Sequence, residues 1–180
     1  MYENGKSRII VTTSVFMTLK IPYIFWQDVV TQDGNRVILL GQNNDYINAT
    51  RIVPYQDYLD RSWIVTQGPM DGTIADFWKL VWQENTRLII MLTKTFEVVR
   101  IMCSQYWPLT ANSHETYGDF KVILQKEENY AHFKVRHFIL EHEGEQKNIT
   151  QFHYISWPLS AQPDSANLLL FRRHILSGNI

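Results

Sequence analysis

The pattern of apolar and polar residues along the chain predicts a series of short strands. Val37 to Leu40 is a β-branched apolar run that ends at Gly41-Gln42-Asn43-Asn44, which indicates a strand followed by a turn. Leu88 to Leu92 is an unbroken apolar run of strand length, a pattern typical of a strand buried on both faces. Both runs therefore predict strands.

Three more strand-like runs follow later in the chain, and polar segments separate them. The runs are Phe120 to Leu124, Phe133 to Leu140 and Asn148 to Ile155. Lys126 to Asn129 and Glu143-Gly144-Glu145 lie between them. Strand-like runs joined by short polar segments predict an antiparallel meander.

Two segments have apolar residues at helical spacing. The first follows Asp71-Gly72, with Thr73 and Asp76 in the positions of a helix cap. Its apolar positions are Phe77, Leu80, Val81 and Trp82. The second begins at Ser165, which we expect to cap it, and Gly178 is a plausible end. Helices and strands together predict a mixed α/β domain.

Length, composition and charge restrict the class of protein. At about 150 residues per domain, 180 residues correspond to one domain. The formal net charge is −1, without the basic excess of nucleic-acid-binding proteins, so we expect no nucleic-acid partner. No apolar run reaches the roughly 18 residues of a membrane span. The one cysteine, Cys103, cannot form an internal disulfide, which favours a reducing, cytoplasmic compartment.

The sequence contains no familiar metal or cofactor motif. His-Glu-x-x-His and paired Cys-x-x-Cys patterns are absent, and the six histidines are scattered along the chain. The glycine patterns of dinucleotide sites and of serine hydrolases are also absent. We therefore predict neither a metal site nor a cofactor.

A series of aromatic-rich motifs carries the strongest signal. In chain order they are Asp45-Tyr-Ile-Asn-Ala49, Thr66-Gln-Gly-Pro69, Phe77-Trp78, Val81-Trp82, Ile90-Met-Leu-Thr93, Cys103-Ser-Gln-Tyr-Trp-Pro108, Phe152-His-Tyr and Trp157-Pro158. In that order and at that spacing they resemble the receptor and non-receptor protein tyrosine phosphatases, from about Trp26 to Arg173. The resemblance implies the phosphatase fold, a mixed, twisted central sheet flanked by helices, and phosphotyrosine hydrolysis as the family reaction.

The resemblance also implies where the nucleophile should be. In the family, a His-Cys-x5-Arg loop supplies the thiolate and the phosphate cradle, and it follows the helix that we place at Ser165 to Leu176. No such motif occurs in the 180 residues, so we expect a C-terminally incomplete domain. Cys103 does not fit the motif, because Met102 precedes it and Leu109 stands six positions on. Its position matches a buried cysteine that the family keeps for packing.

The general acid of the family stands third in a Trp-Pro-Asp motif. Here the tripeptide is Trp157-Pro158-Leu159, and leucine has no proton to donate. Asp164 lies five positions further on, where we expect it to help cap the last helix.

Three further positions carry implied roles in substrate recognition or loop support. Trp26 stands where the family has a tyrosine that stacks on the phosphotyrosine ring, although a core role for Trp26 is an equal alternative. Asp28 stands where an acidic residue holds the backbone of the bound peptide. Glu97 matches a glutamate that supports the catalytic loops, whereas the lysine of that segment is replaced by Met102.

These observations predict an unassigned segment at residues 1–23 and a partial phosphatase domain at residues 24–180. We expect it to be catalytically inactive as given, and to act as a binding or competing module for a phosphotyrosine protein or peptide. One alternative is a fragment of a slow or substrate-trapping phosphatase whose catalytic loop lies beyond residue 180. Another is a degenerate product with no biochemical role. A missing last strand would leave unpaired strand edges, so we also expect marginal stability unless a protein partner covers that side of the sheet.

Overall fold

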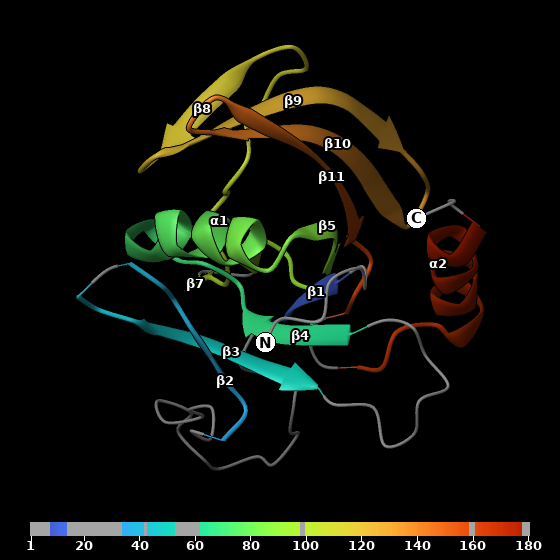
Figure 1. Cartoon of the computed structure of the whole chain (residues 1–180). Helices are drawn as coiled ribbons and strands as arrows, with labels where there is room; N and C mark the ends of the chain where they lie inside the picture. Colours follow the sequence, from blue (N-terminus) through green and yellow to red (C-terminus); the bar gives the residue numbers. More distant parts are fainter. Residues whose placement is uncertain are drawn as a thin grey trace.

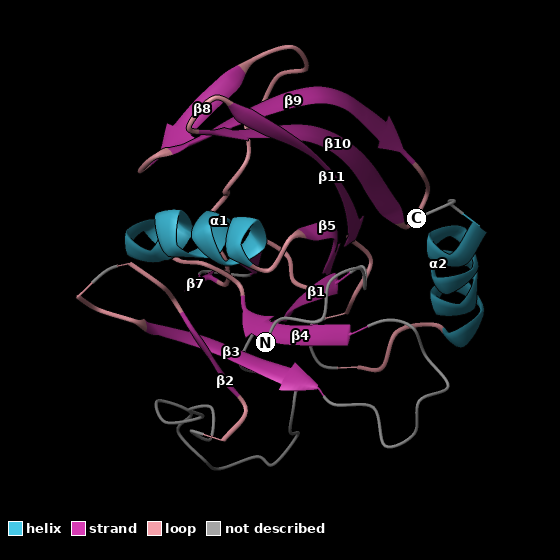
Figure 2. Ribbon diagram, viewed as in Figure 1, coloured by secondary structure: helices cyan, strands magenta, loops and turns pink. Residues whose placement is uncertain are grey.

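The computed structural model describes residues 8–13, 34–41, 43–52, 62–97, 100–158 and 161–177, with only the backbone at positions 13, 97 and 100. The strands are β1 (Arg8–Thr13), β2 (Arg36–Ile38), β3 (Tyr46–Ile52), β4 (Ser62–Gln67), β5 (Thr86–Met91), β6 (Phe96–Glu97), β7 (Arg100–Ile101), β8 (His114–Tyr117), β9 (Phe120–Asn129), β10 (Phe133–His142) and β11 (Glu145–Tyr154). The helices are η2 (Asp71–Thr73), α1 (Ile74–Gln83) and α2 (Ser165–Ser177). The mixed α/β fold predicted from the sequence is therefore confirmed (Figures 1 and 2).

Within the part of the chain that the structure describes, nine strands form one twisted sheet, in the order β2-β3-β4-β1-β5-β11-β10-β9-β8. Neighbouring strands from β4 through β1 and β5 to β11 are parallel, and the remaining pairs are antiparallel. The predicted meander is confirmed as β9-β10-β11. The sheet also includes β8, which the sequence patterns did not indicate.

The N-terminal strand β1 lies in the middle of the sheet, between β4 and β5. Ile9 and Ile10 are almost completely buried there, on opposite faces. The expectation of unpaired strand edges is wrong for β4 and β5, because β1 pairs with both. The part of the unassigned segment that the structure describes is thus a core element.

An ion cluster holds the start of β1. The Glu84 side chain, just after α1, is completely buried and pairs with Arg8 of β1 and Arg51 of β3. Arg51 Nη2 donates to Glu84 Oε1 at 2.7 Å. A buried carboxylate needs such partners, because an unpaired charge in the interior is strongly destabilising.

Two hydrophobic clusters lie on opposite faces of the sheet. Ile10 and Ile89 belong to the cluster that contains α1, whereas Ile9 and Leu88 belong to the cluster with α2. Consecutive residues point to opposite faces of a strand, so these parallel strands are buried on both faces. Figure 1 shows α1 under the arch of β9, β10 and β11, and α2 on the other side of these strands.

Several element boundaries differ from the predictions. Strand β9 extends to Asn129, so the predicted polar separator is part of the strand, and the chain turns after it. Thr73 does occupy the N-cap position of α1, but its hydroxyl makes no cap bond; it accepts from the backbone N–H of Met70 at 3.0 Å instead. Strand β5 and helix α1 agree with the predicted segments within two residues.

The cap of α2 is Asp164, not Ser165. Asp164 Oδ1 accepts a hydrogen bond from the backbone N–H of Asn167 at 2.9 Å, the bond that an N-cap residue makes. The expectation that Asp164 caps this helix is therefore confirmed, and that for Ser165 is wrong. Helix α2 packs on the sheet through Phe171 and Ile175.

Candidate functional site

The carboxyl ends of four parallel strands, β4, β1, β5 and β11, lie at one edge of the sheet. In sheets of this kind, ligands bind outside the carboxyl ends of the strands. Two segments that the resemblance singled out begin at this edge. The segment with Glu97 follows β5, and the Trp157-Pro158 dipeptide follows β11.

Parallel pairing of β5 with β11 brings these two segments together. His153 is the register partner of Met91, and the His153 Nε2 atom lies 3.0 Å from the carbonyl oxygen of Thr93. Beyond Thr93 the chain forms the hairpin of β6 and β7, and the backbone of Glu97 lies in β6. One hydrogen bond therefore links the start of the Glu97 segment to the strand that leads to Trp157.

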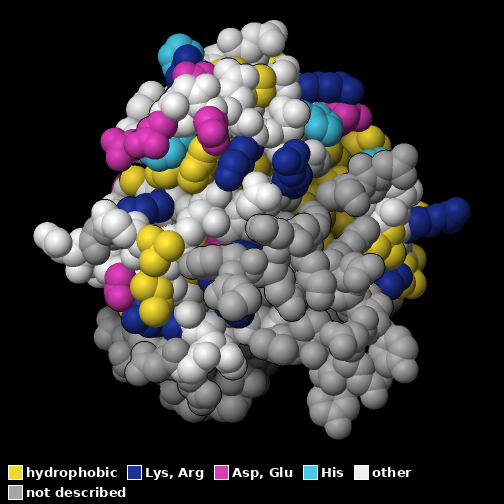
Figure 3. All heavy atoms as spheres, in the orientation of Figure 1, with side chains coloured by type: hydrophobic (Ala, Val, Ile, Leu, Met, Phe, Trp, Pro, Cys, Tyr) yellow, Lys and Arg dark blue, Asp and Glu magenta, His cyan; other side chains and the backbone are white. Residues whose placement is uncertain are grey.

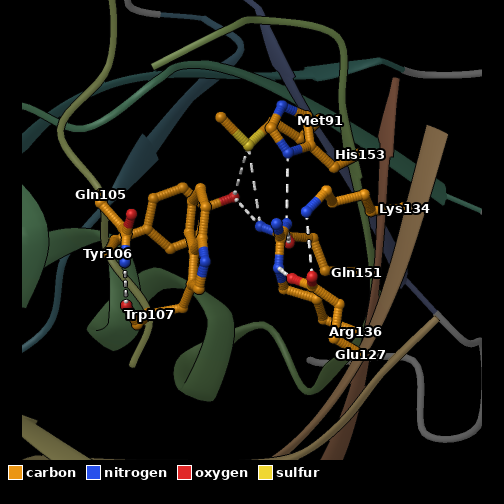
Figure 4. A network of polar contacts seen from close by, with 9 residues as sticks. All are labelled: Met91, Gln105, Tyr106, Trp107, Glu127, Lys134, Arg136, Gln151 and His153. Carbon is orange, nitrogen blue, oxygen red and sulfur yellow. Dashed lines mark hydrogen bonds and ion pairs between the residues drawn. The ribbon is translucent and has the colours of Figure 1, made fainter. Parts of the chain in front are cut away.

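A buried polar network lies beneath this edge, centred on Arg136 of β10 (Figure 4). Arg136 Nε donates to Glu127 Oε2, and Nη1 donates to Gln151 Oε1, both at 2.7 Å. The guanidinium carbon lies 4.5 Å from the centre of the Trp107 ring, a cation–π contact. Because Arg136 is 4% exposed, these partners replace the water that its charge would otherwise require.

The network fixes the protonation state of His153. Arg136 Nη1 donates to His153 Nδ1 at 3.2 Å, so the ring proton is on Nε2 and is donated to Thr93. Burial, and next the positive charge of Arg136, lower the pKa of His153 to about 4. His153 is thus neutral at physiological pH and serves as a structural link.

The network extends to the segment that follows Cys103. Gln151 Nε2 donates to the Tyr106 hydroxyl at 2.8 Å, and burial raises the pKa of that hydroxyl. On the other side, Lys134 Nζ donates to Glu127 Oε1 at 2.9 Å. The network therefore connects three strands of the meander with residues 106 and 107.

Cys103 is buried, and burial raises the pKa of its thiol to about 12. A nucleophilic cysteine needs a lowered pKa and access to substrate. The Cys103 side chain instead packs against Gly68, where an added Cβ would lie 2.8 Å from Sγ. These features fit the structural role expected for this cysteine.

The described residues include one of the four site positions predicted from the sequence. Trp26, Asp28 and Leu159 lie outside the described residues. Glu97 is described in its backbone only.

Among the described residues, no group of three or more His, Cys, Asp or Glu side chains could hold a metal ion. None of the described helices is long and apolar enough to cross a membrane.

The sequence analysis missed Arg136, Gln151 and Glu84 as buried polar residues. A signal existed for Arg136, which shares a strand face with Phe138 and Leu140 because residues at a spacing of two point to the same side. A charged residue in a buried row indicates a partner on a neighbouring strand. The partner itself, Glu127, was placed in the polar segment between two predicted strands and could not be recognised.

Comparison with known proteins identifies the family of this chain. Residues 26–177 match the model of the protein-tyrosine phosphatase family. The chain is 44% identical over 154 residues to receptor-type tyrosine-protein phosphatase U of Gallus gallus, which covers 82% of this chain and 10% of that protein. It is 34% identical over 149 residues to tyrosine-protein phosphatase non-receptor type 12 of Homo sapiens. This match covers 81% of this chain and 19% of that protein.

The chain belongs to the protein-tyrosine phosphatase family, as the motifs predicted. It spans about a tenth and about a fifth of the length of these two relatives.

Proposed function

We propose that this 180-residue chain is a phosphatase-family binding module that does not hydrolyse phosphotyrosine. The observation that carries the proposal is Leu159, which follows Trp157-Pro158 at the position of the general acid. Without an acid, the leaving phenolate oxygen is not protonated, which costs roughly 10²- to 10⁴-fold in rate.

The state of the one thiol supports the same proposal. The chain contains no His-Cys-x5-Arg motif, and Cys103 is buried with a pKa of about 12. These 180 residues thus offer no thiolate to attack phosphorus. Under this proposal, the residues from 1 to 180 supply neither the nucleophile nor the acid of the family reaction.

The proposed ligand is a phosphotyrosine protein or peptide, bound through Trp26 and Asp28. Trp26 would stack on the ring, and Asp28 would hold the peptide backbone. Because the family's phosphate cradle is not among these residues, we expect little discrimination between tyrosine and phosphotyrosine. The free cysteine supports a proposed location in a reducing, cytoplasmic compartment.

The test is an assay of the purified 180-residue chain with a phosphotyrosine peptide. We expect no phosphate release above a protein-free blank, and weak binding by calorimetry that Trp26→Ala reduces. Trp63→Ala, which changes a half-buried tryptophan of β4, is the matched control. Measurable turnover would overturn the proposed inactivity, and tight phosphate-dependent binding would overturn the proposed recognition.

A second candidate function is a slow or substrate-trapping phosphatase whose catalytic loop is encoded after residue 180. Leu159 favours this candidate as well, because loss of the acid alone leaves substrate binding intact. Sequencing the native transcript past the Ile180 codon distinguishes the two. If a His-Cys-x5-Arg loop follows, Leu159→Asp in the longer protein should raise kcat by about 10² or more.

A further inference from the structure

The outward side of helix α2 carries apolar and basic side chains together. Leu169, Leu170 and Leu176 are 63%, 58% and 50% exposed, and Arg172 and Arg173 of the same helix are also exposed. These residues form the α2 face. Figure 3 shows apolar side chains next to Lys or Arg side chains at the right of the molecule, where Figure 1 places α2. Exposed apolar patches of this kind mark interaction sites.

The helical repeat sets the order of these side chains around the helix axis. At about 100° per residue, Leu169 and Leu176 point in nearly the same direction. Arg172 and Arg173 lie about 50° to either side of this direction. The centre of the α2 face is therefore a row of leucines with one arginine on each flank.

The opposite side of α2 fixes the helix on the sheet. Phe171 and Ile175 are buried there, and the Phe171 ring centre lies 5.2 Å from the ring centres of both Phe133 and Tyr154. Asp164 caps the first turn. Because α2 is already folded and held in place, a ligand that binds its outward face incurs no cost of helix formation.

The α2 face is positively charged. Residues 165–177 include two arginines and neither aspartate nor glutamate, and the described part of the chain contains no ion-pair partner of Arg172 or Arg173. Asp164, the nearest acidic residue in sequence, lies about 12 Å along the helix axis from Arg172, at 1.5 Å per residue. The two guanidinium groups therefore favour an anionic surface as ligand.

The spacing of the leucines disfavours a partner helix as that ligand. Two helices that pack along a seam need apolar residues at every third or fourth position. Between Leu169 and Leu176, the positions that would continue such a seam hold Arg172 and Arg173. A lipid surface does not impose this spacing, because leucines enter its apolar region while the long arginine side chains reach the lipid phosphates.

We propose that the α2 face docks the protein on the surface of an anionic lipid bilayer. The leucine row enters the boundary between headgroups and acyl chains, and the flanking arginines pair with anionic headgroups. The cytoplasmic leaflet carries such lipids, which agrees with the location proposed above. This contact is peripheral and reversible, because one short apolar row binds only marginally without the attraction of charges.

The experiment measures how the full 180-residue chain co-sediments with sucrose-loaded vesicles. One set of vesicles contains phosphatidylcholine alone, and the other contains phosphatidylcholine mixed with phosphatidylserine. We expect about 25-fold tighter binding to the vesicles with phosphatidylserine, because each arginine near an anionic surface contributes a factor of about 5. High salt should remove most of this difference, since it screens exposed charges.

A matched pair of double variants tests the arginines. Arg172→Gln combined with Arg173→Gln should abolish the preference for phosphatidylserine. Arg87→Gln combined with Lys121→Gln removes the same number of positive charges from β5 and β9 and should retain the preference. Urea unfolding of each variant verifies that the fold is kept, and the comparison of the two kinds of vesicle requires no variant.

A second matched pair tests the leucine row. Leu169→Ser combined with Leu176→Ser should weaken binding to both kinds of vesicle by about 10-fold, because apolar area no longer leaves water. Ile38→Ser combined with Leu40→Ser changes apolar side chains that are 46% and 52% exposed and should leave binding unchanged.

Three results would overturn the proposal. They are equal binding to the two kinds of vesicle, an equal loss in the variant of Arg87 and Lys121, and self-association through the α2 face that added vesicles do not reduce. The last result would mean that a second copy of the chain covers this face.

Discussion

Arg136 and His153 are buried polar residues on adjacent strands, and each satisfies a requirement of the other. Arg136 needs acceptors, and neutral His153 offers its Nδ1 lone pair. His153 in turn donates to Thr93. This chain of hydrogen bonds works only while His153 is neutral, because protonation would place a second positive charge beside Arg136.

The first prediction concerns acid stability. The pKa of His153 is lowered to about 4 in the folded protein, from an ordinary 6.5. Between pH 6.5 and pH 4, His153 is therefore protonated in the unfolded chain but neutral in the folded protein. Neutral His153 makes its full contribution to the free energy of unfolding above pH 6.5, and this free energy falls by about 1.4 kcal/mol per pH unit as the pH drops from 6.5 towards 4.

Urea unfolding at pH 7, 6 and 5 checks this prediction. His153→Gln should reduce the pH dependence relative to the wild type, even though it is less stable at pH 7. His114→Gln, which changes an exposed histidine of β8, is the control. Identical slopes in the wild type and His153→Gln would contradict the assignment.

At the scale of elements, β1 has the largest consequence for the fold. Without it the sheet would separate into β2-β3-β4 and β5-β11-β10-β9-β8. Both halves would then expose the unpaired edge of a buried parallel strand, which is an aggregation hazard. Residues 8–13 thus complete the sheet, and the Arg8–Glu84 ion pair holds their first residue.

The second prediction tests the place of β1. Ile10→Asp puts a charge into the fully buried centre of the sheet and should lower the free energy of unfolding by more than about 4 kcal/mol. Ile52→Asp, at an exposed position of β3, should change it by less than about 1 kcal/mol. Equal stability of the two variants in urea would show that residues 8–13 are not in the sheet.

The third prediction concerns the cap of α2. Asp164→Ala should lower the free energy of unfolding by about 0.5–2 kcal/mol, because the N–H of Asn167 loses its acceptor. Ser165→Ala should have little effect, since Asp164 provides the cap. Chemical denaturation of both variants is the measurement, and a larger loss for Ser165→Ala would refute the cap assignment.

At the scale of the whole molecule, the sheet is covered on both faces, but α2 leaves an apolar surface. Leu169, Leu170 and Leu176 are exposed on this helix, and Figure 3 shows apolar side chains at the right of the molecule, where α2 lies. Exposed apolar patches promote association. We therefore expect association of this chain to involve the exposed leucines of α2.

The fourth prediction follows from this surface. Leu169→Glu combined with Leu170→Glu should reduce aggregation on heating, measured by light scattering. The free energy of unfolding should change by less than about 1 kcal/mol, because both side chains are exposed. Leu140→Glu, in the buried core, should instead unfold the protein. Undiminished aggregation in the double variant would mean that another surface is responsible.

The sequence by itself determined the family, α1, α2 and the β9-β10-β11 meander. Helical spacing and short polar segments between strands are local signals. They predict the folded structure correctly because the residues involved contact near neighbours in the sequence. The motif series also predicts that Leu159 stands at the position of the general acid. The prediction that Lys126 to Asn129 separates two strands was wrong, because these residues belong to β9. Their charge did not exclude a strand, since a half-exposed strand tolerates charged residues on its outer face.

Only the tertiary structure decided where β1 lies, which carboxylate pairs with Arg8, and how Arg136 meets His153. A parallel strand pairs with residues distant in sequence, so its own pattern does not specify its neighbours. The apolar positions of this chain dictated that a core would form, whereas long-range pairing of strands and charges decided its arrangement.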